Sequence, residues 1–184
     1  IPSEERSISS NIFEKLPELF FDSPDYEHNV GIYGRENNKR VIKWVSRKII
    51  DDHPNLEKYK VLLPASNGSG AIGEVLSTPL VGEPLVGYTQ TFISFGAFDN
   101  KKEAEYLLKY IKTKFLRTML GTMKVTQHNQ SKEVWKNVPI QDFTANSDID
   151  WSQSIKDIDQ QLYKKYNLSQ DEIDFIESKV RAMD

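Results

Sequence analysis

Cysteine is absent from the 184-residue chain. Disulfide bonds and thiolate metal sites are therefore excluded, and this composition favours a reducing cytoplasm. No apolar run approaches the about 20 residues that a membrane-spanning helix needs, and the acidic N-terminus lacks the apolar segment of a signal peptide. We accordingly expect a cytoplasmic protein without a membrane partner.

Residues that would carry catalysis are also scarce. The three histidines, His28, His53 and His128, are far apart, and none has the spacing of a metal-ligand motif. The chain lacks the GxSxG nucleophile elbow of hydrolases and the [DNS]PP[YF] tetrapeptide of amino-methyltransferases. The glycine-rich stretch ASNGSGAIGE at 65–74 matches neither GxxxxGK[ST] nor GxGxxG. We therefore expect no metal, no cofactor, no catalytic residue and no enzyme activity in this chain itself.

Charge is plentiful but unevenly placed around a net value of −3. Residues 3–28 carry two basic and seven acidic side chains, whereas residues 29–140 carry seventeen basic and ten acidic, a balance of +7. Residues 141–184 carry five basic and ten acidic side chains. Local charge matters more than the total when phosphates are the partner. The distribution predicts a basic body whose positive side chains form a single surface for a double helix.

The apolar periodicity predicts a mixed α/β (α+β) fold with several strands, a long central helix and a C-terminal helical hairpin. A stripe at three- and four-residue spacing places the central helix at 100–121. Asn100 would be its N-cap, Glu103 would complete a capping box, and Gly121 would end it.

The remaining elements follow from alternation and turn residues. Strands are predicted on both sides of a turn at 34–39, at 56–63, and as one long strand at 86–98. Residues 76–85 and 134–140 contain proline and are predicted to be edge strands or extended connections. Two helices should follow a linker at 144–150, the second opened by a Ser169–Glu172 capping box. We therefore divide the chain into a lead-in at 1–27, a main domain at 28–143 and an acidic helical hairpin at 144–184.

Polar and basic side chains indicate which residues would contact DNA, because Arg or Lys suits guanine and Asn or Gln suits adenine. The base-reading candidates lie after the central helix and in the first hairpin: Gln127, His128, Asn129, Gln130, Arg35, Asn37, Asn38 and Arg40. The phosphate-contact candidates are Lys39, Lys43, Arg47, Ser66, Asn67, Ser69, Lys114, Arg117, Lys124, Lys132 and Lys136.

Several sequence segments carry a resemblance to a known family. They are TQTFISFGAF at 89–98, EAEYLLKYIKTKFLR at 103–117, KVTQHNQ at 124–130, VPIQDF at 138–143 and DIDQQLYKKYNLSQDEIDFIE at 157–177. In these segments the chain resembles the C-terminal target recognition (specificity) domain of bacterial type IIG-like restriction–modification enzymes and adenine-specific DNA methylases.

The resemblance implies a module that recognises a specific double-stranded DNA sequence and that is built on an irregular, twisted mixed sheet. It also implies an upstream methyltransferase domain in the same polypeptide, which would use S-adenosylmethionine. In this family a nuclease domain, which would use Mg²⁺, often lies upstream as well. A chain that begins at Ile1 and lacks catalytic motifs fits a fragment of such a protein. The family has no fixed set of base-reading residues, so the candidates named above depend on their chemistry alone.

Two alternatives remain open. A stand-alone metal-dependent nuclease could use Asp25 and Glu177, since Pro24-Asp25 and Glu177-Ser178-Lys179 match the letters of a carboxylate nuclease motif. A protein-interaction module could act through the acidic C-terminal helices instead. Each candidate residue also has a plain structural interpretation, because charged hairpin faces are usually solvated and histidines usually serve packing.

Overall fold

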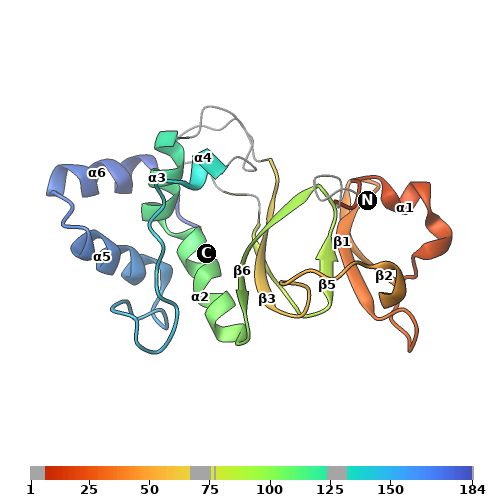
Figure 1. Ribbon diagram of the computed structural model, residues 1–184. Coiled ribbons are helices and arrows are strands. Elements are labelled where there is room, and N and C mark those ends of the chain that lie inside the picture. Colours follow the sequence, from red (N-terminus) through yellow and green to blue (C-terminus); the bar gives the residue numbers. More distant parts are fainter. Residues whose placement is uncertain (1–6, 67–75, 77, 124–131, 184) are drawn as a thin grey trace.

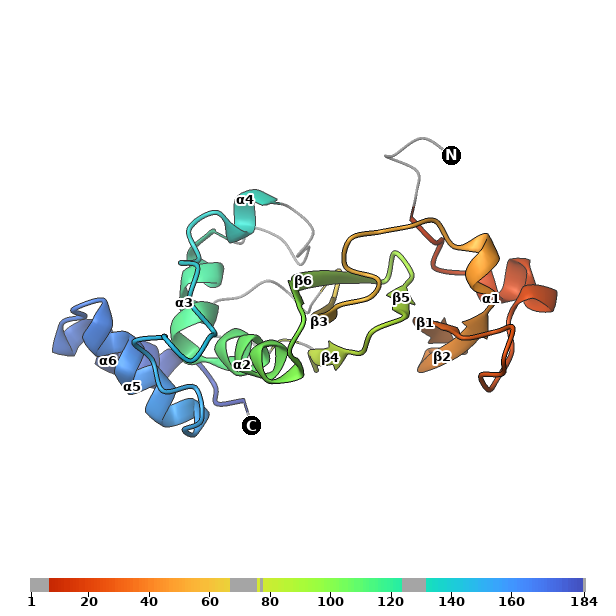
Figure 2. The same ribbon diagram turned by 60° about the horizontal axis from the view of Figure 1, so that its bottom comes forward.

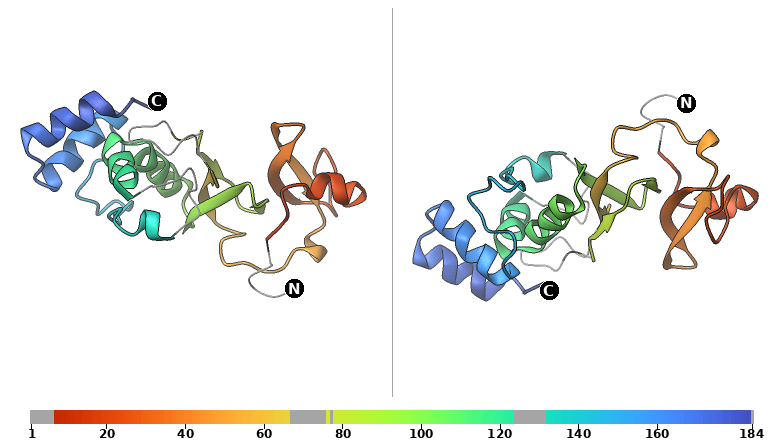
Figure 3. Two further views of the ribbon diagram at one scale, coloured as in Figure 1. Left: turned by 90° about the horizontal axis from the view of Figure 1, so that it is seen from above. Right: turned by 90° about the horizontal axis from the view of Figure 1, so that it is seen from below.

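The computed structural model describes residues 7–66, 76, 78–123 and 132–183 of the chain. Figure 1 shows an elongated molecule in which two small sheets separate a helical end from an N-terminal end. The same arrangement is visible from above and below in Figure 3. The α+β class predicted from the sequence is confirmed, but the expected single mixed sheet is two three-stranded sheets.

The first sheet has the order β2-β1-β5 and contains β1 (Val30–Glu36), β2 (Lys39–Val45) and β5 (Val86–Tyr88). β1 is antiparallel to β2 and parallel to β5. The predicted hairpin is confirmed, with a two-residue turn at Asn37 and Asn38, whose φ angles are 49° and 62°. Positive φ at both central residues is typical of the turn that matches strand twist, and asparagine tolerates it.

The outer face of this sheet is covered by the N-terminal segment. Val30, Ile32 and Val45 pack with Phe13 of α1 (Ile12–Lys15), which the 3₁₀ helix η1 (Pro17–Leu19) follows. A Cβ atom at Gly34 would lie 2.6 Å from the Phe13 ring, so only glycine allows this close approach. After β2 the chain makes a second 3₁₀ helix, η2 (Arg47–Ile49).

The second sheet has the order β4-β3-β6 and is antiparallel, formed by β3 (Tyr59–Pro64), β4 (Leu80–Gly82) and β6 (Phe92–Phe98). Side chains alternate along β3, so Leu62 packs toward the first sheet while Val61 and Leu63 pack toward the helices. The second sheet is therefore a middle layer, with α2 packed against it (Figure 2).

The prediction of one long strand at 86–98 is wrong. The chain leaves the first sheet after Tyr88 and enters the second at Phe92. Between them the Thr89 N–H donates to the Tyr33 carbonyl at 3.0 Å, and the Phe92 N–H donates to the Thr89 carbonyl at 3.0 Å. Strand-favouring residues run through this turn, so intrinsic propensity does not reveal it.

A buried lysine connects the two sheets. The Lys60 side chain is fully buried in β3, and its Nζ donates to the carbonyls of Asn55, Leu56 and Lys58 at 2.9–3.2 Å. Leu56 in turn accepts from the Leu85 N–H at 2.8 Å, and Leu85 accepts from the Gly31 N–H in β1 at 2.9 Å. Burial lowers the pKa of Lys60 to about 8.

The predicted central helix is two helices, α2 (Lys101–Lys112) and α3 (Lys114–Met123), so the expectation of one continuous helix is wrong. Thr113 between them has an extended ψ of 148°, and its hydroxyl accepts from the Leu116 N–H at 3.2 Å. Asn100 caps α2 as expected, through a 2.9 Å bond from the Lys102 N–H. Gly121 lies inside α3 and does not end it.

The C-terminal part contains α4 (Lys132–Trp135), α5 (Ile155–Lys165) and α6 (Gln170–Lys179). The extended piece expected at 134–140 is wrong at its start, since Val134 and Trp135 are helical. The Ser169–Glu172 capping box of α6 is confirmed.

The apolar core of the helical end crosses the expected domain boundary after residue 143. One cluster joins Val61 and Leu63 of β3 to Phe115 of α3, Ile158 of α5 and Ile176 of α6. The segment interpreted as a linker contributes Ile149, which is 4% exposed. The C-terminal helices therefore share one core with α2 and α3.

Candidate nucleic-acid interface

The tip of the β1–β2 hairpin presents basic and amide side chains to solvent. Arg35 lies directly opposite Arg40 in the register, and Glu36 lies opposite Lys39. Arg35, Asn37, Asn38 and Lys39 are exposed, and none of these side chains has a partner among the residues that the structure describes. Like charges directly opposite each other destabilise a strand pair. An anion beside Arg35 would relieve that repulsion.

Arg40 is held by the fold. Its Nη1 donates to the Thr78 carbonyl at 2.8 Å, and its guanidinium lies 5.7 Å from the centre of the Phe92 ring. Arg40 is half-buried, so it fixes the tip of the hairpin against the second sheet. We therefore separate it from its neighbour Arg35, whose side chain extends into solvent.

Apolar side chains lie next to the two arginines on the same face of the sheet. Because side chains two residues apart point the same way, Ile42 and Trp44 follow Arg40 on this face of β2. Ile42 is 41% exposed, and Trp44 is paired through its backbone with Phe21, which is 40% exposed. Alternation in the sequence places Ile42 and Trp44 together, but only the structure adds Phe21.

Two candidates close to the hairpin are neutralised within the fold. Lys43 is 2.6 Å from the Asp22 carboxylate and 3.3 Å from that of Glu36, and the hydrogen bond to Asp22 is the largest cause of its raised pKa. Arg47 donates to the Ile50 carbonyl at 2.6 Å and also pairs with Asp52. These pairs offset the charges of Lys43 and Arg47 within the fold, so among the described residues neither side chain is an unpaired cation like Arg35 or Lys39.

Two candidates on α3 are likewise corrected. Arg117 is 3% exposed, and its guanidinium donates to the carbonyls of Lys112 and Thr113 at 3.2 Å and of Arg181 at 2.5 Å. Lys114 lies 2.5 Å from the Glu177 carboxylate. The sequence pattern predicts one helix over 100–121 and gives no sign that Arg117 is buried. The break at Thr113 changes which face α3 buries.

The expected single basic surface does not form among the described residues. α3 belongs to the helical end, whereas β1 and β2 lie beyond the second sheet (Figure 1). Ser66 and Lys136 are exposed after β3 and α4, and Lys132 begins α4. The remaining candidates lie outside the described residues: Gln127, His128, Asn129, Gln130, Asn67, Ser69 and Lys124.

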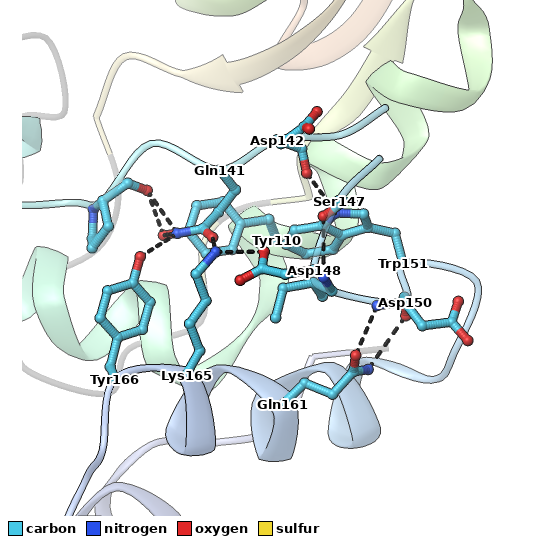
Figure 4. A network of polar contacts seen from close by, with 12 residues as sticks. Tyr110, Gln141, Asp142, Ser147, Asp148, Asp150, Trp151, Gln161, Lys165 and Tyr166 are labelled. Atoms are coloured by element: carbon cyan, nitrogen blue, oxygen red, sulfur yellow. Dashed lines mark hydrogen bonds and ion pairs between the residues drawn. The ribbon is translucent and has the colours of Figure 1, made fainter. Parts of the chain in front are cut away.

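A polar network fixes the segment that leads into α5 (Figure 4). Gln141 donates to the Tyr166 hydroxyl at 2.7 Å and accepts from Lys165 at 2.9 Å, and Lys165 also contacts Asp148 at 2.7 Å. The Trp151 indole donates to the Asp142 carbonyl at 2.8 Å. Each of these side chains has a hydrogen-bond partner within the protein, so we interpret the network as structural.

The Tyr110 hydroxyl belongs to the same network and is buried. The Tyr110 hydroxyl donates to the Pro139 carbonyl at 2.8 Å, and burial raises the pKa of Tyr110 well above its ordinary value. The phenol therefore stays protonated at physiological pH and acts as a donor that holds residues 138–143 against α2.

The carboxylates of the alternative nuclease interpretation are not brought together. Asp25 lies before β1 and contacts His28 at 2.9 Å, while Glu177 in α6 contacts Lys114 and the Tyr163 hydroxyl. Within the described part of the chain no group of three or more His, Cys, Asp or Glu side chains could hold a metal ion. Over the same residues no helix is long and apolar enough to cross a membrane.

Comparison with known proteins finds no matching family model, no matching curated protein and no matching solved structure.

Proposed function

We propose that this protein binds double-stranded DNA through the tip of the β1–β2 hairpin, as the recognition module of a restriction–modification enzyme. The observation that carries the proposal is the set of four exposed side chains, Arg35, Asn37, Asn38 and Lys39, without partners among the described residues. A two-stranded ribbon fits the major groove of B-DNA, which is about 12 Å wide. In this arrangement Arg35 and the asparagines contact base edges, and Lys39 contacts phosphate.

The fold supports a rigid presentation of this ribbon. Phe13 packs against one face of β1, and Arg40 ties the tip to Thr78 on the other side. A preorganised ribbon loses little conformational entropy on binding, so its contacts translate into affinity. Gln127 and Asn129 lie outside the described residues and stay base-reading candidates on their chemistry alone.

The resemblance in sequence adds the wider context of the proposal. The module acts in the cytoplasm, next to a methyltransferase domain of the same polypeptide that binds S-adenosylmethionine. In enzymes of this family that also cleave DNA, a nuclease domain adds the Mg²⁺ site. The chain itself contributes recognition and no catalytic step.

The first test is DNA binding over a series of salt concentrations, measured by fluorescence anisotropy with a short labelled duplex. The wild-type protein should bind with an affinity that falls steeply with salt, because phosphate contacts release counterions. The double variant Arg35→Gln, Lys39→Gln should bind more weakly, and it should reduce the log–log salt slope by about 1, because Lys39 is the one phosphate contact that it removes.

The control is Lys164→Gln, which removes an exposed lysine of α5 at the other end of the molecule. It should leave both the affinity and the salt slope unchanged. Equal losses in the two proteins, or binding without salt dependence, would overturn the assignment of the hairpin as the DNA-binding element.

A further inference from the structure

A groove lies between α3 and α6, at the end of the molecule opposite the hairpin (Figure 1). Its volume is about 360 Å³, near the lower end of the roughly 300–1,000 Å³ of ligand pockets. Its lining is mostly apolar and comes from both helices and the turn between α5 and α6: Phe115, Thr118, Met119, Leu168, Asp171, Glu172, Phe175 and Ile176. A site of this size suits an anchoring side chain.

Phe175 stands out among these residues, because it takes no part in the core. α6 buries Ile176 and places Ile173 against the same cluster, whereas Phe175 is 48% exposed on another face of the helix. α6 is held at its start by the Ser169–Glu172 capping box, so this aromatic wall has a fixed position. Exposed aromatic side chains on rigid elements are typical anchors of interfaces.

The charged residues of the groove are both acidic. Asp171 and Glu172 precede Phe175 and Ile176 by one helical turn, which puts each carboxylate next to an apolar side chain. Asp171 has no partner among the described residues, and hydrogen bonds from Ser169 keep the pKa of Glu172 below its ordinary value. Residues 141–184 carry ten acidic and five basic side chains, a net charge of −5 for the segment that contains α5 and α6.

We propose that this groove binds a short amphipathic helix of another protein, with an apolar anchor flanked by lysine or arginine. The apolar side chain of that helix packs between Phe115, Met119 and Phe175, and its cations face Asp171 and Glu172. This is the helix-in-groove mode, in which apolar anchors give affinity and flanking charges give partner choice. The surface is separate from the hairpin and does not depend on DNA binding.

The test uses two labelled peptides with identical leucines at helical spacing, one with lysine and one with glutamate on the polar face. Anisotropy should show that the lysine peptide binds about tenfold more tightly or better, a difference of about 1.4 kcal/mol. Phe175→Ala should weaken binding of the lysine peptide about fivefold or more, as expected for an interface anchor. Asp171→Lys should weaken it as well.

Two control variants match these changes in chemistry at other sites. Tyr26→Ala removes a fully exposed aromatic of the N-terminal part, and Glu105→Lys reverses an exposed charge on α2. Both should bind the lysine peptide like the wild type. Because Phe175 is half exposed, Phe175→Ala should have the same thermal unfolding midpoint as the wild type. The double hairpin variant Arg35→Gln, Lys39→Gln should bind the lysine peptide like the wild type, because the groove is separate from the hairpin.

Three results would overturn the proposal. These are equal affinity for the two peptides, unchanged binding by Phe175→Ala, and self-association of the wild-type protein that Phe175→Ala abolishes. The last result, read by sedimentation, would show that a second copy of this chain covers the groove.

Discussion

Asp159 is a buried carboxylate in α5 that binds backbone groups at the start of α3. It is 2% exposed in α5, and its two oxygens accept from the backbone N–H groups of Lys114 and Phe115 at 3.0 and 2.9 Å. Asp159 therefore caps the N-terminus of α3 from another helix, where a negative charge also suits the helix dipole. Burial opposes that charge and dominates, raising the pKa of Asp159 to about 6.

This raised pKa predicts a specific dependence of stability on pH. Between about pH 4 and pH 6 the folded protein keeps the proton that the unfolded chain loses, so stability falls as pH rises through this window. Replacing Asp159 by asparagine removes the titration. The free energy of unfolding of the wild type, relative to Asp159→Asn, should therefore decrease by roughly 2 kcal/mol from pH 4 to pH 7.

Urea unfolding of both proteins across this range is the measurement. The neighbouring groups Glu177, Lys114, Arg117 and Tyr163 are present in both proteins, so their contributions largely cancel. A constant difference between the two proteins would contradict the prediction. Asp159→Ala should be destabilised at every pH, because both N–H groups lose their acceptor at about 1–3 kcal/mol each.

At the scale of single elements, the backbone of the β1–β2 turn predicts how substitutions at its two central residues change stability. Asn37 and Asn38 both have positive φ, a conformation that costs an ordinary L-residue about 1–2 kcal/mol. The double variant Asn37→Ala, Asn38→Ala should therefore lose about 2 kcal/mol of stability in thermal or urea unfolding. Asn38→Gly should keep the stability, because glycine adopts this backbone without strain.

The same glycine variant separates turn geometry from DNA contact. If the Asn38 amide contacts a base, Asn38→Gly should weaken DNA binding while the protein stays as stable as the wild type. Normal DNA binding by this variant would leave Asn38 with a conformational role only. The anisotropy assay with a duplex is the readout for both results.

The helices show where element-scale prediction works and where it fails. The capping box of Ser169 and Glu172 and the Asn100 cap were predicted, because each involves neighbours within three residues. The break at Thr113 was missed, since the apolar spacing continues through it. The break is stabilised by Asp159, which is 45 residues from Lys114 in sequence.

At the scale of the whole molecule, three apolar clusters follow one another along its length. Phe13 and Ile32 belong to the first, Tyr33 and Phe92 to the second between the sheets, and Leu162 to the third among the helices. The rings of Tyr33 and Phe92 are 4.6 Å apart. The middle cluster therefore couples the ribbon end to the helical end.

Truncating a side chain of the middle cluster should allow the ribbon end and the helical end of the molecule to unfold independently. Phe92→Ala should cost about 3–5 kcal/mol and lower hydrogen-exchange protection in both sheets, because Phe92 contacts both. Phe13→Ala deletes the same side chain from the first cluster, and should lower protection in β1 and β2 only. Loss of protection in α5 and α6 equal to that in the sheets after Phe92→Ala would show a single cooperative unit instead.

The sequence by itself determined the α+β class, the hairpin turn, the N-caps of Asn100 and Ser169 and the exclusion of disulfides. Each of these depends on residue type or on neighbours a few positions away, so local sequence carries the information. Only the tertiary structure decided that Arg117 is buried, that Lys43 and Lys114 are paired, and that the strand at 86–98 divides between two sheets. Those outcomes depend on partners far along the chain, whose approach local patterns do not encode.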